Sequence, residues 1–126
     1  AAAMAGEALS RVPDVQIDAD GVFKYVLVRV RGAGALAKDV VRGHGWAEYH
    51  ADLFERTAEE LARHGLSCEC LGGGRLSHRP EERKIHLSLG TLFRLQGFGR
   101  ADHAVTTEKL KAEYPNYEIT WADEGY

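Results

Sequence analysis

The chain has little of several features that would assign it to a broad class of protein. It has no apolar run of the ~18 residues that a membrane-spanning helix needs, so we expect no membrane segment. Its 16 Lys and Arg against 19 Asp and Glu leave a net charge of -3. That balance argues against a general binder of nucleic acid or of anionic membranes.

Cysteine is also scarce, and the two that occur, Cys68 and Cys70, are one residue apart. In an extended strand both side chains point the same way, so a disulfide between them has poor geometry. We therefore expect a reducing compartment. The candidate zinc ligands are Cys68, Cys70, His78 and His86. Because Cys-X-Cys is not a usual zinc spacing and is typical of two small side chains facing inward, we expect no metal site.

Two common catalytic motifs are missing. There is no Gly-X-Ser-X-Gly, which argues against a serine hydrolase built on a nucleophile elbow. The glycine run at 72–74 is not followed by Gly-Lys-Ser/Thr, which excludes a phosphate-binding loop of the ATPase kind.

The 126 residues, 44% of them hydrophobic, suit one domain with its own core. We expect a single domain over 1–126 in which residues 1–12 form a flexible N-terminal tail. The first residues lack the basic and long apolar stretches of a secretory signal.

Hydrophobic patterning predicts a mixture of strands and helices. Strands are expected at 15–17, 22–30, 39–43, 66–71, 75–78, 83–89 and 117–121, with a bend or bulge at the glycines 72–74. One helix is expected at about 50–64, and a second is expected to start at a Thr106 or Thr107 cap and end at Tyr114. The fold class is therefore α/β (α+β), with one mixed β-sheet of about six strands flanked by two α-helices.

Two charged or titratable residues stand out against this pattern. Lys24 shares a strand face with valines, so it either extends to solvent at the end of the sheet or binds an anion. His50 lies at a predicted helix start, where unpaired N–H groups and the helix dipole favour a phosphate and a neutral imidazole. A neutral imidazole serves as nucleophile or general base, but position alone favours an ordinary surface histidine near a cap, since the chain has six histidines.

The glycines 72–74 and the arginine that follows them form a weaker signal. Glycines let the backbone approach a ligand closely, and Arg75 is placed to pair with a phosphate. A plain bulge is the alternative.

Most of the chain resembles one known family, the protein-histidine phosphatase or janus family. The stretches that carry the resemblance, in family order, are 17–27, 41–43 with 46–52, 68–75, and 107–122. The resemblance implies hydrolysis of the P–N bond of phosphohistidine in partner proteins, without metal or cofactor, by a cytosolic monomer.

The resemblance also implies roles for particular residues. His50 matches the catalytic histidine, as general base or as nucleophile, and Lys24 matches the substrate-binding lysine. Arg42 and Arg75 match arginines near the phosphate, and the N–H groups of His50 and Ala51 are expected to cradle it.

The resemblance breaks at 87–96, where the family contributes a serine and backbone N–H groups to the phosphate. An alignment anchored on Phe98-Gly99 assigns this place to Leu95, Gln96 and Gly97. An alignment anchored on His86 assigns it to Thr91. The loss of a donor raises an alternative function, a module that binds phosphohistidine proteins but turns over poorly. A phosphotransfer carrier with His50 as the relay is a third.

Overall fold

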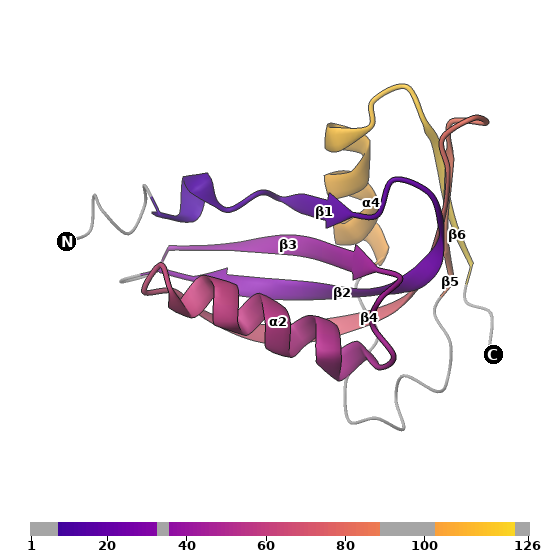
Figure 1. Ribbon diagram of the computed structural model, residues 1–126. Helices are drawn as coiled ribbons and strands as arrows, with labels where there is room; N and C mark the ends of the chain where they lie inside the picture. Colours follow the sequence, from indigo (N-terminus) through magenta and orange to yellow (C-terminus); the bar gives the residue numbers. More distant parts are fainter. Residues whose placement is uncertain (1–7, 33–35, 89–102, 123–126) are drawn as a thin grey trace.

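The structure is a computed structural model that describes residues 8–32, 36–88 and 103–122. These residues form one six-stranded mixed sheet with a helix on each face, which confirms the predicted α+β fold (Figure 1). The elements are β1 (Val15–Ile17), β2 (Gly21–Arg31), β3 (Ala37–His44), α2 (His50–Ala62), β4 (Ser67–Arg79), β5 (Lys84–Ser88), α4 (His103–Glu113) and β6 (Glu118–Ala122).

The strands lie in the order β1-β3-β2-β4-β5-β6. The long strand β2 is central and pairs antiparallel with β3 and β4, while β1 and β6 add parallel to β3 and β5. The strands β4 and β5 pair antiparallel and form a hairpin. In Figure 1, β5 and β6 rise steeply away from β1 and β3, on the side of the sheet where α4 lies.

Strict alternation along β2 divides the core into two clusters. One face carries Phe23, Tyr25 and Leu27 against α4, and the other carries valines against α2. The α4 cluster comprises Val15, Phe23, Tyr25, Leu27, Val41, Leu76, Ile85, Leu87, Leu110 and Ile119. The α2 cluster comprises Leu9, Val12, Val26, Val28, Val30, Val40, Ala47, Leu53, Leu61 and Leu66. A strand covered on both sides is what the apolar residues on both faces of 22–30 predict.

The expected tail over 1–12 is wrong for its last five residues. Residues 8–11 form a helical turn, a third helical segment beside the two expected. Leu9 and Val12 are buried in the α2 cluster, and the Val12 carbonyl accepts a 2.5 Å hydrogen bond from the Lys38 ammonium group. This segment is ordered because it covers apolar surface at the end of α2's face.

The cap expected at Thr106 or Thr107 is also corrected, because α4 begins at His103. Thr106 lies one turn inside the helix and is fully buried, so it packs instead of capping.

The glycines of β4 bend the strand without ending it. Gly72 has a φ of +147°, and the pairing of β4 with β2 shifts between Leu27 and Val28. Leu27 pairs with Gly72 and Val28 pairs with Cys70, so Leu71 is the extra residue of a β-bulge. The sequence left a bend or a bulge open at these glycines, and the structure has a bulge there.

In the three described ranges, no helix has both the length and the apolar character needed to cross a membrane.

Candidate active site

The site begins with a row of side chains across the sheet. Lys24 on β2 pairs with His44 on β3 and with Arg75 on β4. Directly opposed residues of antiparallel strands have Cβ atoms about 5 Å apart and point to the same face, here the face that α2 covers. Lys24 is half-buried and Arg75 is exposed, so the row runs from the edge of the core to solvent.

His50 reaches this row from the start of α2. It is the first residue of the helix and only 4% exposed, and its Nε2 lies 2.9 Å from the carbonyl oxygen of Gly74. A carbonyl only accepts, so Nε2 carries the proton. In the neutral ring the lone pair is then on Nδ1. Because Gly74 precedes Arg75, the hydrogen bond holds the imidazole beside the row.

The backbone at the start of α2 supplies donors at the same place. Tyr49 is the N-cap, in extended conformation, and its N–H donates to the Asp52 carboxylate at 2.8 Å. The first N–H groups of a helix have no acceptor within it, and they attract anions. His50 and Ala51 occupy these first positions, which are the donors that the resemblance implies.

Arg42 lies apart from the row. It sits on β3 two residues before His44, pairs with Val26, and is 2% exposed beneath α2. Burial lowers the pKa of its guanidinium, and the nearby carboxylates of Glu60 and Asp14 oppose that shift. The structure thus brings Lys24, Arg75 and His50 together, and Arg42 lines an adjoining pocket that His44 of the row also lines. Its role at the phosphate stays a prediction.

The sequence reasoning missed His44. Its Nδ1 is 2.9 Å from Asp18 Oδ1, and the other carboxylate oxygen accepts from the Gly45 N–H at 2.7 Å. Partial burial alone would raise the pKa of Asp18, but these two hydrogen bonds outweigh it and the pKa lies below its usual value. The His44 ring stacks on Trp46, with centroids 5.7 Å apart. Only the β2–β3 register reveals that His44 is a neighbour of Lys24, and a single sequence does not contain that register.

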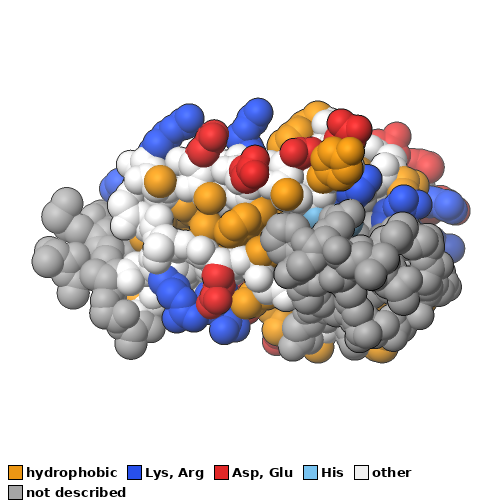
Figure 2. Space-filling view, turned by 90° about the horizontal axis from the view of Figure 1, so that it is seen from below, with side chains coloured by type: hydrophobic (Ala, Val, Ile, Leu, Met, Phe, Trp, Pro, Cys, Tyr) orange, Lys and Arg blue, Asp and Glu red, His pale blue; other side chains and the backbone are white. Residues whose placement is uncertain are grey.

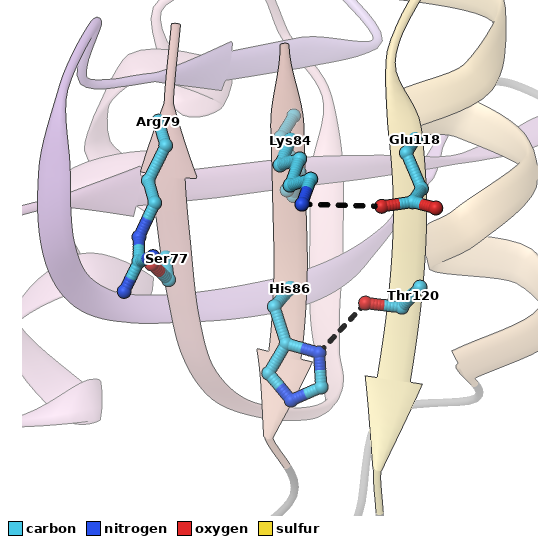
Figure 3. Close-up of a pocket in the computed structure, with 7 residues that line it drawn as sticks. Ser77, Arg79, Lys84, His86, Glu118 and Thr120 are labelled. Atoms are coloured by element: carbon cyan, nitrogen blue, oxygen red, sulfur yellow. Dashed lines mark hydrogen bonds and ion pairs between the residues drawn. The ribbon is translucent and has the colours of Figure 1, made fainter. Parts of the chain in front are cut away.

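The same face continues past Arg75 as an open pocket of about 350 Å³ on β4, β5 and β6. Figure 3 shows its polar side chains, which come from three adjacent strands: Ser77, Arg79, Lys84, His86, Glu118 and Thr120. Lys84 pairs with Glu118 at 3.8 Å, and His86 Nδ1 lies 2.8 Å from the Thr120 hydroxyl. The polar groups there largely satisfy one another.

Charges on the surface seen from below are mixed, since acidic and basic side chains alternate along it in Figure 2. The described part of the chain places no group of three or more His, Cys, Asp or Glu where it could hold a metal. Cys68 and Cys70 are free and half-buried, and burial raises the pKa of the Cys70 thiol to about 11.

Of the 87–96 region only Leu87 and Ser88 are described, at the end of β5, and the residues expected to contribute donors lie outside the described residues. This concerns Thr91, Leu95, Gln96 and Gly97, whose roles stay predictions.

Comparison with known proteins gives a consistent result. The family model described as Janus/Ocnus family (Ocnus) matches residues 9–118. The 14 kDa phosphohistidine phosphatase of Sus scrofa is 49% identical over 124 residues, which is 94% of this chain and 95% of the relative. The human protein of the same name is 49% identical over 129 residues, 98% of this chain and 100% of the relative.

A third relative carries a different name. The sex-regulated protein janus-A of Drosophila melanogaster is 45% identical over 123 residues, covering 98% of this chain and 88% of the relative. With a family model spanning most of its length and relatives at this identity, the chain belongs to the Janus/Ocnus family.

Proposed function

We propose that this protein is a protein-histidine phosphatase that hydrolyses the P–N bond of phosphohistidine in partner proteins. The observation that carries the proposal is the hydrogen bond between His50 Nε2 and the Gly74 carbonyl, which sets the imidazole beside the Lys24–Arg75 row. Two relatives at 49% identity named phosphohistidine phosphatase support it.

The row and the helix start suit a transferred phosphoryl group. Such a group needs positioning and neutralisation of its oxygens, and donors that are already in place supply both. Lys24 and Arg75 bring positive charge, and the N–H groups of His50 and Ala51 bring helix-terminal donors. Leu95, Gln96 and Gly97 are proposed as further backbone donors. No step requires a metal or a cofactor, because the P–N bond is already labile.

The tautomer of His50 fits both chemical routes. With the proton on Nε2, the Nδ1 lone pair either attacks phosphorus or takes a proton from an attacking water. In the first route Nδ1 bonds to phosphorus as the P–N bond of the substrate breaks, and the substrate imidazole leaves with the electron pair and takes a proton from water. A second water then hydrolyses the phosphohistidine on the enzyme, which releases phosphate and restores His50. In the second route water attacks phosphorus as Nδ1 takes its proton, the substrate imidazole leaves with the electron pair of the P–N bond and receives a proton, and phosphate is released in one step. Trapping of labelled phosphate on the protein separates the two.

We further propose that the protein works as a cytoplasmic monomer. The modest net charge and the two free cysteines support this. Sedimentation of the full chain checks the oligomeric state.

The test is phosphate release from a phosphohistidine peptide in the presence of a chelator. His50→Ala should lower the rate of phosphate release by about 10²–10⁴-fold, the usual contribution of a positioned acid–base group. His64→Ala is the matched control, because His64 is exposed beyond the other end of α2. Equal rates for the parent and His50→Ala would refute the assignment.

A second candidate is the phosphohistidine-binding module, favoured by the departure from the family pattern at 87–96. In that case the parent binds the phosphopeptide and releases no phosphate, and His50→Ala changes neither result. Binding and release measured on the same samples decide between the two functions.

A further inference from the structure

His44 lies in the row of side chains across the sheet and has no part in the mechanism described so far. It pairs with Lys24 in the register of β2 and β3, on the face that α2 covers, and it is half-buried. A titratable ring one strand away from the lysine that is proposed to bind phosphate is close enough to contact the substrate. The candidate site therefore contains a second histidine besides His50.

Two neighbours fix the orientation of the His44 ring. The pKa of the Asp18 carboxyl lies below its usual value, so this group is ionised at neutral pH and only accepts hydrogen bonds. His44 Nδ1 lies 2.9 Å from Asp18 Oδ1 and therefore carries a proton. The ring also stacks on Trp46, with centroids 5.7 Å apart and planes 15° apart. Among the residues described, Nε2 has no hydrogen-bond partner, and it points away from Asp18.

The charges around His44 suit a ring that holds a proton on each nitrogen once a substrate is bound. The Asp18 carboxylate at Nδ1 balances the positive charge of such a ring. Lys24 opposes it, but a phosphoryl group bound at Lys24 offsets that charge. Further charged side chains share a pocket with His44, namely Arg42, Arg56, Glu60 and Arg63. Arg56 and Arg63 are exposed, so solvent and salt screen their effect.

The order of the strands places the two histidines on opposite sides of Lys24. His44 is on β3, and His50 is hydrogen-bonded to Gly74 on β4, while Lys24 is on β2 between those strands. In phosphoryl transfer the attacking atom and the leaving atom lie roughly in line through phosphorus. When a phosphoryl group bound over Lys24 is attacked from the side of His50, its leaving nitrogen is therefore on the side of His44.

We propose that His44 is the general acid of the reaction and that its Nε2–H protonates the leaving imidazole of the substrate. The inference rests on the proposed phosphatase function, and it replaces water by His44 as the proton donor. As the P–N bond breaks, its electron pair stays on the substrate nitrogen, which bonds to the proton. The electrons of the Nε2–H bond stay on Nε2, so His44 becomes neutral and regains a proton from solvent. The step is the same in both routes at His50.

Two substitutions separate proton donation from packing. His44→Asn puts an amide N–H near the place of Nδ1–H, so it keeps the contact with Asp18 but has no proton to transfer. His44→Phe keeps a ring against Trp46 and also lacks the acid. The matched control is His86→Asn, because His86 is a half-buried histidine of the same sheet whose Nδ1 lies 2.8 Å from the Thr120 hydroxyl. Melting temperatures establish that each variant is folded.

The measurement compares two P–N substrates that differ in their need for a proton. A phosphohistidine peptide releases an imidazole that must be protonated, whereas N-phosphoryl-4-nitroimidazole releases a stabilised anion without a donor. Both His44 variants should lower kcat for the peptide by about 10²-fold or more, the usual effect of losing a general acid, with KM nearly unchanged. For the nitroimidazole substrate, kcat should stay within a few-fold of that of the parent. His86→Asn should match the parent on both substrates.

An equal loss of kcat on both substrates would overturn the inference, because a His44 that only supports the fold or the phosphoryl group affects them alike. A His44→Asn variant as active as the parent on the peptide would overturn it too. In either case the phosphatase proposal stands if the parent releases phosphate and His50→Ala does not. A parent that releases no phosphate would refute both proposals, so the two failures are distinguishable.

Discussion

The two faces of the sheet each bury a histidine and use it differently. On the α4 face, His78 is 3% exposed, with Nδ1 2.8 Å from the Asp18 carbonyl oxygen and Nε2 3.4 Å from the Tyr117 hydroxyl. The Tyr114 ring packs edge-on against it at 5.2 Å. On the α2 face, His50 Nε2 donates to the Gly74 carbonyl at the start of a helix, beside Lys24 and Arg75.

The two histidines therefore differ in role: His78 packs in the core, and His50 lies at the candidate active site. His78 is held by hydrogen bonds and aromatic rings that belong to the fold, so both of its nitrogens serve structure. The α2 face instead keeps charged side chains next to valines, and Arg42 there has donors that the described residues leave unmet. Charges in such places cost folding energy, which indicates that they are retained for a ligand.

The largest effect should come from the α4 core. Leu110 is fully buried, so Leu110→Ala should lower the free energy of unfolding by about 2–5 kcal/mol through lost contacts and a cavity. Urea unfolding measures this, with Lys111→Ala, on the exposed side of α4, as control. Catalysis per folded molecule should persist, and the contrast between the faces would fail if it vanished.

On the α2 face, a substitution should lower the catalytic rate and leave the stability of the fold nearly unchanged. Lys24→Met should reduce kcat/KM for a phosphohistidine peptide by about 10²–10³-fold, the usual effect of losing one charge-stabilising donor. Its unfolding free energy should stay close to that of the parent. Lys84→Met is the matched control, since Lys84 is an exposed lysine of the same sheet paired with Glu118. A large stability loss with unchanged kcat/KM would make Lys24 a structural residue.

A substitution at His78 should have an effect of intermediate size, and it tests the contrast between the two faces of the sheet. His78→Phe keeps a ring but leaves the Asp18 carbonyl and the Tyr117 hydroxyl without this partner, at a cost of about 1–3 kcal/mol. The phosphatase rate at saturating substrate should be unaffected. Thermal and urea unfolding beside the rate assay test both halves, and a rate as low as that of His50→Ala would contradict the structural role.

The smallest effect concerns Asp18 and pH. Its pKa is lowered in the folded protein, so its stabilising contribution is present above the unfolded value of 3.8 and is lost as the pH falls through the folded pKa below it. Because the side chain is 39% exposed, we expect less than ~1 kcal/mol. Asp18→Asn should remove this part of the acid dependence in urea melts between pH 2 and 6. An identical pH profile would assign the shift no role in stability.

Much of the fold is predictable from local pattern. The apolar run predicts a strand over 22–30, and the strand observed is Gly21–Arg31. The helix predicted over 50–64 is His50–Ala62, with Gly65 at a φ of +72° just beyond it. The order of strands is not predictable in this way. It depends on pairing between distant segments, such as β2 with β4, which no local periodicity records.

The candidate site shows the same limit: its local features are predictable from sequence, and its tertiary contacts are not. The anomalies at Lys24 and His50 are visible in sequence because a charge on a valine face and a histidine at a helix start are local facts. The neighbours His44 and Gly74 depend on register and on a tertiary hydrogen bond. Arg42 matches the family by sequence position, but its burial against Leu53 and Thr57 of α2 appears only once the helix is placed over β3.

Because of the bulge at Leu71 and Gly72, the residues of β4 that face α2 are even-numbered before it and odd-numbered after it. Before it, Cys68 and Cys70 face α2. After it, Gly73 and Arg75 do, although strict alternation from Cys70 would have turned Arg75 toward α4. The bulge at the glycine run therefore shifts the alternation of side chains by one residue. Loss of the extra residue would remove the bulge and still leave Arg75 opposite Lys24 on the α2 face, so this segment can absorb a one-residue change in length that a regular strand could not.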